Sequence, residues 1–442
     1  MKELVKKTLV LLLAFAMVFS MAACGGSGET ADASADTPAE IKSGDRIKIS
    51  FWTIIPEGDP CYADFMELVN GFNAAQDQYE IEHVGYPFLD FFGKMTTAFS
   101  GGVAPDVFMY TMEDVPARAA NNTVVNLTPY MERDGFDTGD YYELELEAGV
   151  YEGGQYALPL SSTCRMLWYN LDMFEEVGLT EADVPTTWDE LYEVAHKMDV
   201  VNEGIIERLG FDPTAGQSFF HPFLWQAGLD FFDENGDPLL TQQDHVDVLQ
   251  WFLDFNKDYS YIQRQSFTDT GKTLAADPFV SGRVGMMIGN DSEYSLLTSA
   301  EVDFRYGVTT VPMPEDGVRT NWSSCWSIEA FNSGDEDRIN GAWEFIKYMS
   351  TKENAEKFYD ALGWLTASKS ANEGLKDDPI MAKIIEELPY STEKVYWDFA
   401  PKWQEDFMQF QEAALADGDA QAAMEAAQTF FIEKKANFEA TH

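Results

Sequence analysis

The sequence predicts an α/β protein with room for two domains. The chain has 442 residues, and single hydrophobic cores stop growing well below that length. Stretches with the two-residue period of a strand alternate with stretches that have the helical period of 3.6 residues. Strands that alternate with helices along a chain are typical of a parallel sheet covered by helices.

The first elements of this layer follow from apolar spacing. Alternating apolar residues predict a first strand at Ile47, Ile49 and Phe51 and a second at Tyr79, Ile81 and His83. A helix between them is predicted from apolar residues one helical turn apart, namely Phe65, Leu68, Val69 and Phe72. A short helix near 94–100 should end at Gly101-Gly102, and 106–110 is predicted as a compact strand.

The middle and end of the chain repeat this alternation. Thr187 with Glu190, and Ser333 with Glu336, have the spacing of a capping box and predict two helix starts. Residues 284–290 read as a buried strand. The buried faces of the two helices are expected at Trp188, Leu191, Ala195 and Met198, and at Ile339, Trp343, Ile346 and Met349.

Acidic residues dominate the charge. There are 76 Asp and Glu against 29 Lys and Arg, which gives a net charge of −47. Such a surface repels phosphate backbones, so nucleic acid is excluded as a partner. The excess keeps the protein soluble, and no catalytic inference is drawn from it.

The start of the chain has the pattern of a targeting segment. Basic residues precede an apolar run, Leu9 to Phe19, that is too short to span a membrane comfortably. Met21-Ala22-Ala23-Cys24 resembles a bacterial lipobox, although leucine is usual at the position of Met21. The resemblance implies a lipoprotein signal peptide over 1–23, a palmitate-type lipid on Cys24 and a flexible linker over 24–45. The alternative is an ordinary secretory signal with an incidental cysteine.

Enzyme and metal motifs are absent from the sequence. It contains no GxSxG, no P-loop and no HExxH. The five histidines are scattered, and Cys61, Cys164 and Cys325 have no CxxC spacing, so they are expected as free thiols. Asp233 to Gly236 resembles part of a calcium loop but is more simply a hairpin turn. We expect no metal and no cofactor. A pair of carboxylates could still be hidden by the many acids, which keeps a secreted glycoside hydrolase as an alternative.

Three stretches resemble a known family. They are Lys94–Tyr110 (KMTTAFSGGVAPDVFMY), Tyr156–Met198 with its YNLDMF and PTTWDE segments, and the stretch from YGVTTVPMPEDG through NWSSCWSIEAF to AEKF at 358. Together they resemble the extracellular solute-binding proteins of family 1, the sugar-binding lipoproteins of ABC importers that are related to maltose-binding protein. The resemblance spans nearly all of the chain that follows the leader.

The resemblance implies the two-lobe fold of periplasmic binding proteins of type II, with hinges between the lobes and the ligand in the cleft. The chain should cross between lobes near Leu160, Thr310 and Thr366. The N-terminal lobe is then 46–160 with 311–365, and the C-terminal lobe is 161–310 with 366–442. A monomeric, non-enzymatic receptor is implied, anchored outside the cytoplasm by Cys24 and delivering its ligand to the membrane subunits of an ABC permease.

The implied ligand residues are aromatic side chains for sugar faces and polar side chains for sugar hydroxyls. Some follow a strand or lie at a crossing, and others lie in stretches where relatives contribute aromatic residues to the cleft. Of Trp322 and Trp326, which flank the same three residues, one is expected to face it. Thr163 stands where relatives have an acid, so Arg165 is expected to take over that contact. The predicted site residues are Trp52, Tyr110, Glu113, Arg165, His221, Trp225, Asp291, Trp322, Trp326 and Trp397.

Two other kinds of ligand remain open within the same fold. A phosphate would need clustered basic residues, and Arg165 is the only one placed near the cleft. A polyamine would suit acids and aromatic rings, which makes it the stronger competitor to a carbohydrate.

Overall fold

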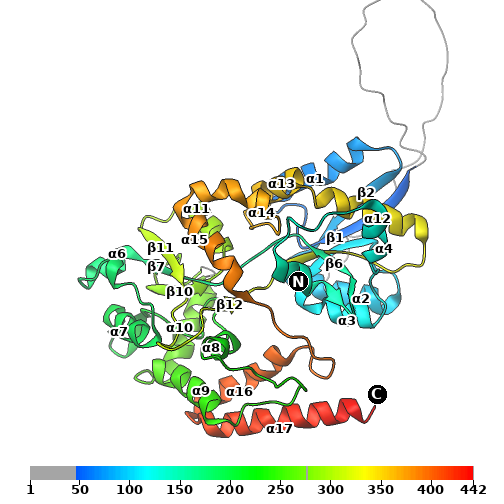
Figure 1. Cartoon of the computed structure of the whole chain (residues 1–442). Coiled ribbons are helices and arrows are strands. Elements are labelled where there is room, and N and C mark those ends of the chain that lie inside the picture. The colour runs from blue at the N-terminus through cyan, green and yellow to red at the C-terminus, as the bar shows by residue number, and fades with distance from the viewer. Residues whose placement is uncertain (1–45, 275–276, 442) are drawn as a thin grey trace, which may run out of the picture. The chain divides into compact units, whose positions relative to one another are not determined.

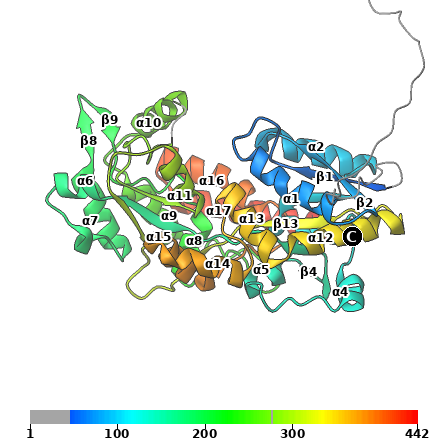
Figure 2. The ribbon, with the colours of Figure 1, turned by 90° about the horizontal axis from the view of Figure 1, so that it is seen from above.

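The computed structural model describes residues 46–274 and 277–441 of the chain. The predicted leader over 1–23, Cys24 and the predicted linker lie outside the described residues. Helices and strands alternate through the described part, and the longer strands form two separate sheets, each with its own helices (Figures 1 and 2). None of the described helices has the length and apolar character needed to cross a membrane.

The larger sheet has five strands in the order β2-β1-β3-β13-β6. β1 pairs in parallel with β2 and β3, which confirms the predicted α/β layer, and β13 lies antiparallel between β3 and β6. The strands are β1 (Ile47–Thr53), β2 (Tyr79–Gly85), β3 (Val107–Thr111), β6 (Ala157–Pro159) and β13 (Trp326–Ala330).

The smaller sheet has three strands in the order β10-β7-β11. They are β7 (Met166–Asn170), β10 (Met286–Gly289) and β11 (Tyr306–Thr310). β10 and β11 both run antiparallel to β7, which lies between them. Alternation of helices and strands therefore does not produce a parallel sheet in this part of the chain. Three further pairs of short strands are described: β4 (Val150–Tyr151) with β5 (Gly154–Gln155), β8 (Val200–Asn202) with β9 (Ile205–Arg208), and β12 (Asn321–Trp322) with β14 (Ser391–Thr392).

The helices fall into two sets along the chain. Those with the larger sheet are α1 (Tyr62–Ala75), α2 (Phe88–Gly101), α3 (Val115–Ala120), α4 (Thr128–Asp134), α5 (Glu143–Ala148), α12 (Glu336–Met349) and α13 (Lys352–Leu362). The others are α6 (Leu171–Glu176), α7 (Trp188–Met198), α8 (Phe220–Gln226), α9 (Gln243–Phe255), α10 (Tyr261–Leu274), α11 (Ser292–Ser299), α14 (Lys369–Asn372), α15 (Pro379–Glu387), α16 (Trp403–Asp417) and α17 (Ala420–Glu439).

The apolar faces predicted from helical spacing are buried. The four predicted residues of α1 are at most 4% exposed, and those of α12 are at most 5% exposed. Each sheet has a core of its own, because the α1 and α12 faces pack with β1 and β3 while β7 and β10 pack with α7 and α15. The helix predicted near 94–100 is α2, which begins earlier, at Phe88, and ends at Gly102 with φ of 63° as expected for a glycine C-cap.

One predicted capping box is confirmed and the other is wrong. Thr187 accepts a hydrogen bond from the backbone N–H of Glu190, whose carboxylate bonds back to Thr187, so α7 starts as predicted. α12 instead starts after Asp335, whose carboxylate accepts the N–H groups of Asp337 and Arg338. A carboxylate next to the positive end of a helix binds these N–H groups better than the hydroxyl of Ser333.

The predicted turn and free thiols are observed. Phe232 and Pro238 form an antiparallel bridge around the Asp233 turn, with Gly236 at φ of 77°. The Asp233 carboxylate accepts N–H groups of the turn itself. In the described part of the chain, no group of three His, Cys, Asp or Glu side chains is arranged to hold a metal ion. The three described cysteines form no disulfide, and two of them, Cys164 and Cys325, are buried.

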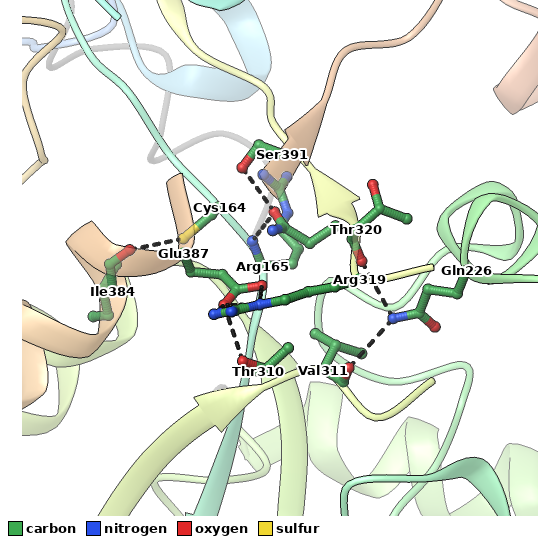
Figure 3. A network of polar contacts seen from close by, with 11 residues as sticks. Cys164, Arg165, Gln226, Thr310, Val311, Arg319, Thr320, Ile384, Glu387 and Ser391 are labelled. Carbon is green, nitrogen blue, oxygen red and sulfur yellow. Dashed lines mark hydrogen bonds and ion pairs between the residues drawn. The ribbon is translucent and has the colours of Figure 1, made fainter. Parts of the chain in front are cut away.

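Two of the predicted lobe crossings are bonded to each other. Ser161 and Thr366 form an antiparallel bridge, and the N–H of Ser162 donates to the carbonyl of Leu365 at 2.9 Å. The remaining connection, 311–320, is held by Arg319, whose guanidinium pairs with Glu387 of α15 at 2.6 Å. Figure 3 shows this pair together with Thr310, which also donates to Glu387. The exact lobe boundaries stay a prediction.

Replacing Glu293 by Gln should stabilise the protein above neutral pH. Burial, with the charge of Asp277, raises the pKa of Glu293 from 4.5 to about 8. The folded state therefore holds a proton that the unfolded state has released, and stability falls as pH rises from 4.5 to 8, by at most about 1.4 kcal/mol per pH unit. Urea unfolding at pH 5 and pH 8 measures this effect. The gain of Glu293→Gln should grow with pH, whereas Glu315→Gln, at an exposed loop position, should show no such growth. An equal effect at both pH values would contradict the prediction.

Candidate functional site

The candidate site lies at the edge of the larger sheet where β1, β2 and β3 have their carboxyl ends. Ligands of open α/β sheets bind outside this edge. β13 runs the other way, so its first residue, Trp326, pairs with Thr111 at the end of β3 and belongs to the same edge. The chain continues from β3 into Glu113, and the crossing at 160–166 starts from the same side of the sheet through β6.

Arg165 is the centre of a buried polar group of residues. Its backbone N–H donates to Asn321 Oδ1 at 3.0 Å, and its guanidinium donates to the carbonyl of Trp322 at 3.2 Å. The guanidinium also lies 4.2 Å from the centre of the Trp322 ring. The hydroxyl of Ser391 in β14 donates to the same oxygen, Asn321 Oδ1, at 3.0 Å. Thus three distant segments of the chain meet at one arginine.

Arg165 is a buried cation without a counterion. The side chain belongs to a residue that is 6% exposed, and none of the ion pairs formed between described residues involves it. Burial lowers its pKa to about 10, against the opposing charges of Glu113 and Asp291. It therefore remains charged at neutral pH and retains an unmet need for hydrogen-bond acceptors.

His221 sits next to Trp322 among aromatic rings. Its ring centre is 4.8 Å from that of Trp225, 5.0 Å from Trp322 and 5.4 Å from Trp403, and all three rings are roughly perpendicular to it. The residue is 2% exposed. Burial, with the charges of Lys394 and Arg165, holds the pKa of His221 well below its ordinary value. The imidazole is therefore neutral, with one donor and one acceptor nitrogen.

Two acids and a lysine complete the group. Lys394 pairs with Glu113 at 3.1 Å, which joins the segment after β14 to the segment after β3. Its neighbour Glu393 lies beside Cys325, whose thiol is 3.8 Å from Glu393 Oε1. We call Glu113, Arg165, His221, Asn321, Trp322 and Glu393 together the Arg165 pocket.

Every member of the Arg165 pocket has a buried polar atom without a hydrogen-bond partner among the described residues. Some of these atoms are donors, namely Arg165 Nε, Asn321 Nδ2 and Trp322 Nε1. Others are carboxyl oxygens, namely Glu113 Oε1 and Glu393 Oε2, and His221 contributes both of its ring nitrogens. Buried polar groups in proteins are normally paired. So many unpaired atoms at one place indicate a position for a polar ligand or for water.

A row of aromatic rings begins at Trp326 on the same sheet edge. The ring centres of Trp326 and Trp364 are 6.0 Å apart with planes 15° apart, and the ring centre of Phe92 is 6.4 Å from that of Trp326 with planes 26° apart. Phe88, at the start of α2, contacts Trp326 with its edge and is 52% exposed. We call Phe88, Phe92, Trp326 and Trp364 the aromatic ledge. Partly exposed, nearly parallel rings can receive a flat apolar ligand face.

The structure places Trp52 and Tyr110 on the α2 side of the sheet. Tyr110 is 9% exposed and lies against Phe91 and Phe92, with the Arg118 guanidinium 4.4 Å from its ring. Trp52 contacts the edge of Tyr86 and lines a separate cavity of about 670 Å³ near the Gly102 turn. Neither residue joins the Arg165 pocket.

Asp291 and Trp397 already have structural partners. Asp291 accepts the Thr163 hydroxyl at 2.7 Å and the Leu365 N–H at 3.0 Å, so it holds two crossings together. Trp397 packs with Phe232 and Phe399 against the core of the C-terminal helices. Trp225 is partly exposed, and its ring centre lies 4.8 Å from that of His221. We therefore place Glu113, Arg165, His221 and Trp322 in the Arg165 pocket, with Trp225 at its border, and Trp326 in the aromatic ledge.

Sequence reasoning missed five members of these two groups and one neighbour. The missed members are Asn321, Glu393, Phe88, Phe92 and Trp364, and the neighbour is Lys394. Asn321 and Glu393 belong to or follow strands of two residues, which leave no periodic signal. Trp364 could have been predicted from the sequence. It lies just before the predicted crossing near Thr366, and an aromatic residue at a crossing is close to both lobes.

Comparisons with known proteins bear on the family and the fold of the chain. A family model described as bacterial extracellular solute-binding protein matches residues 67–383. The sn-glycerol-3-phosphate-binding periplasmic protein of Brucella melitensis is 23% identical over 335 residues, which are 72% of this chain and 74% of the relative.

Solved structures extend the similarity over both sheets. CpMnBP1 with mannotriose bound has a TM-score of 0.76 at 21% identity, over 87% of this chain and 100% of that one. An ABC substrate-binding protein from Listeria monocytogenes in complex with cycloalternan has a TM-score of 0.73 at 20% identity, over 89% of this chain and 100% of that one. At these identities the likeness shows a shared two-lobe α/β fold.

Proposed function

Because this chain belongs to the family of bacterial extracellular solute-binding proteins, we propose that it captures a carbohydrate, and in particular an oligosaccharide, between its lobes and delivers it to an ABC importer. The family consists of binding proteins, and the protein acts outside the cytoplasm. Closure of the two lobes around the ligand would be favoured by the contacts that the ligand makes only in the closed form.

The mixture of unpaired donors and acceptors in the Arg165 pocket is the observation that carries this proposal. A sugar hydroxyl both donates and accepts, so one ligand can satisfy Arg165 Nε and Glu113 Oε1 together. A polyamine only donates and would leave Arg165, Asn321 and Trp322 unpaired. A phosphate group only accepts at neutral pH and would meet the carboxylate of Glu113. The aromatic ledge supports the carbohydrate further, because sugar rings have an apolar face.

Calorimetry against a small panel tests the proposed ligand class. The panel contains mannotriose, maltotriose, spermidine and sn-glycerol 3-phosphate, and the purified protein is titrated with each. We expect a saccharide to bind with a Kd in the micromolar range or tighter, which corresponds to about 8 kcal/mol. Binding of spermidine or the phosphate alone would overturn the carbohydrate assignment. A search for new reducing ends after incubation with the saccharides tests the hydrolase alternative, and none should appear.

Loss of the aromatic ledge should weaken saccharide binding without unfolding the protein. Trp326→Ala removes the ring between Phe92 and Trp364, and stacking on one aromatic ring contributes on the order of 1 kcal/mol beyond its burial. We expect Kd to rise about tenfold or more in the same calorimetry. Trp251→Ala offers a control of similar size, since Trp251 packs on Trp188 in the other core. An unchanged Kd for Trp326→Ala would remove the ledge from the proposal.

The anchor and the permease belong to the same proposal. Cys24 follows Met21-Ala22-Ala23, and lipid on this residue would hold the receptor at the outer face of the cell membrane, with 24–45 as a tether. Mass spectrometry of the N-terminal peptide of the cell-expressed protein checks this. The expected product starts at Cys24 with lipid attached, and Cys24→Ser should release the protein into the medium. A mature chain that starts elsewhere would contradict the anchor and leave the cleft proposal unaffected.

A further inference from the structure

Glu393 has a setting that its neighbours do not share. It directly precedes Lys394, yet the lysine pairs with Glu113, and no ion pair between described residues includes Glu393. Its Oε2 is buried and has no hydrogen-bond partner among the described residues. Burial raises the pKa of Glu393 well above its ordinary value, and the charges of Glu113 and Glu145 raise it further. Ser323 and the charge of Arg165 oppose this shift without reversing it, and a buried carboxyl that forms no ion pair is favoured as the neutral acid.

Cys325 indicates which oxygen carries the proton. Its thiol lies 3.8 Å from Glu393 Oε1 and donates a weak hydrogen bond to it. An oxygen that accepts a hydrogen bond serves as the carbonyl oxygen of a carboxylic acid. The hydroxyl of the acid is then assigned to Oε2, which has no hydrogen-bond partner among the described residues, while the Ser323 hydroxyl, likewise without one, faces the same carboxyl.

We propose that Glu393 is a specificity-determining residue of the Arg165 pocket, where its Oε2–H donates a hydrogen bond to an oxygen of the bound saccharide. This inference rests on the proposed function. It adds a requirement on the ligand, namely an acceptor oxygen at this position. A ligand that presents an ammonium or another donor-only group there would leave Oε2–H unpaired and would be rejected.

The charged groups that face Glu393 give the expected pH dependence. Glu113 follows β3, Glu145 lies on α5, Arg165 lies at the first crossing, Lys394 adjoins Glu393, and the neutral groups are Cys325 and Ser323. Loss of the proton would remove the donor and add a negative charge beside Glu113 and Glu145. Saccharide affinity should therefore fall as pH rises past the pKa of Glu393, by up to about tenfold per pH unit.

The test compares two substitutions at three pH values. The probe is whichever of mannotriose and maltotriose binds the wild-type protein, and Kd is measured by calorimetry at pH 5.5, 7 and 8.5. Glu393→Gln keeps a neutral group that donates from the same place, so its Kd should stay within about threefold of the wild type at pH 5.5 and should not weaken with pH. Glu393→Ala removes the donor and should raise Kd by about 10- to 100-fold at all three values. Glu412→Gln and Glu412→Ala, at an exposed position of α16, are the matched controls and should behave as the wild type.

The outcomes separate this inference from the proposed function. If neither trisaccharide binds the wild type, the carbohydrate function fails and the inference fails with it. If one binds but both Glu393 variants bind as the wild type does, only the role of Glu393 is overturned. If Glu393→Gln loses as much affinity as Glu393→Ala at pH 5.5, Glu393 acts as an ionised acceptor and the neutral-donor role is wrong. Circular dichroism of each variant excludes unfolding as the cause.

Discussion

Replacing Arg165 by methionine should reduce saccharide affinity by about 100-fold or more while the fold is preserved. The guanidinium supplies the buried, unpaired Nε and lies over Trp322, so its loss removes a charge-assisted hydrogen bond to the ligand, worth about 1.5–3 kcal/mol, and shifts the ring beside it. The contact that holds the crossing is made by the backbone N–H of Arg165 and survives the substitution. Calorimetry with the wild-type ligand measures the effect.

Two controls make the Arg165 result interpretable. Arg165→Lys keeps the charge but not the planar fork and should recover only part of the affinity. Arg305→Met removes an arginine whose side chain is 58% exposed and should not change Kd. Because Arg165 is a buried cation without a counterion, Arg165→Met should melt at the same temperature as the wild type or higher. A large loss of stability together with unchanged affinity would assign Arg165 a structural role.

Removing Arg118 should cause the largest loss of stability. Arg118 donates from Nε and from a terminal nitrogen to both oxygens of Glu329, at 2.7 and 2.5 Å, and Glu329 is 0% exposed. Arg118→Met leaves this carboxylate buried beside Ser327 alone, and breaking one side of such a pair costs about 3–5 kcal/mol. Urea unfolding, followed by tryptophan fluorescence, measures the change.

A double substitution separates the ion pair from packing. Arg118→Met with Glu329→Gln removes both charges and should recover much of the loss, because a neutral amide costs far less to bury than a lone carboxylate. Lys48→Met breaks a pair with Glu82 in which both side chains are at least half exposed, and it should change the free energy of unfolding far less than Arg118→Met does. If Arg118→Met lowered the free energy of unfolding no more than Lys48→Met, the Arg118–Glu329 pair would not be a main support of the pairing between β3 and β13.

The parallel part of the fold could be predicted because its signals are local. β1, β2 and α1 each show their period within fewer than fifteen residues, and a parallel layer follows from their alternation. β13 could not be placed in the same way. Its position between β3 and β6 depends on a return of the chain from the other lobe, and no local pattern records such a return.

The site was predicted unevenly for a related reason. The resemblance to a family identified Arg165 and Glu113 by their position after a strand or at a crossing. It could not choose between Trp322 and Trp326, which flank the same three residues. The structure gives them different partners, since Trp322 lies on Arg165 and Trp326 lies on Trp364. Glu393 stood among 76 acids, and only its burial and its missing partner distinguish it from the others.

The bonding between two crossings affects the thermodynamics of lobe closure. Residues 160–162 and 365–367 are joined by backbone hydrogen bonds, and Asp291 accepts from both Thr163 and Leu365. Neither connecting segment can twist without the other. The open form of the receptor therefore has little more torsional entropy in these two connections than the closed form. Ordering a loose hinge would have to be offset by ligand contacts. A paired hinge avoids that cost, and more of the free energy of the sugar contacts remains available as affinity.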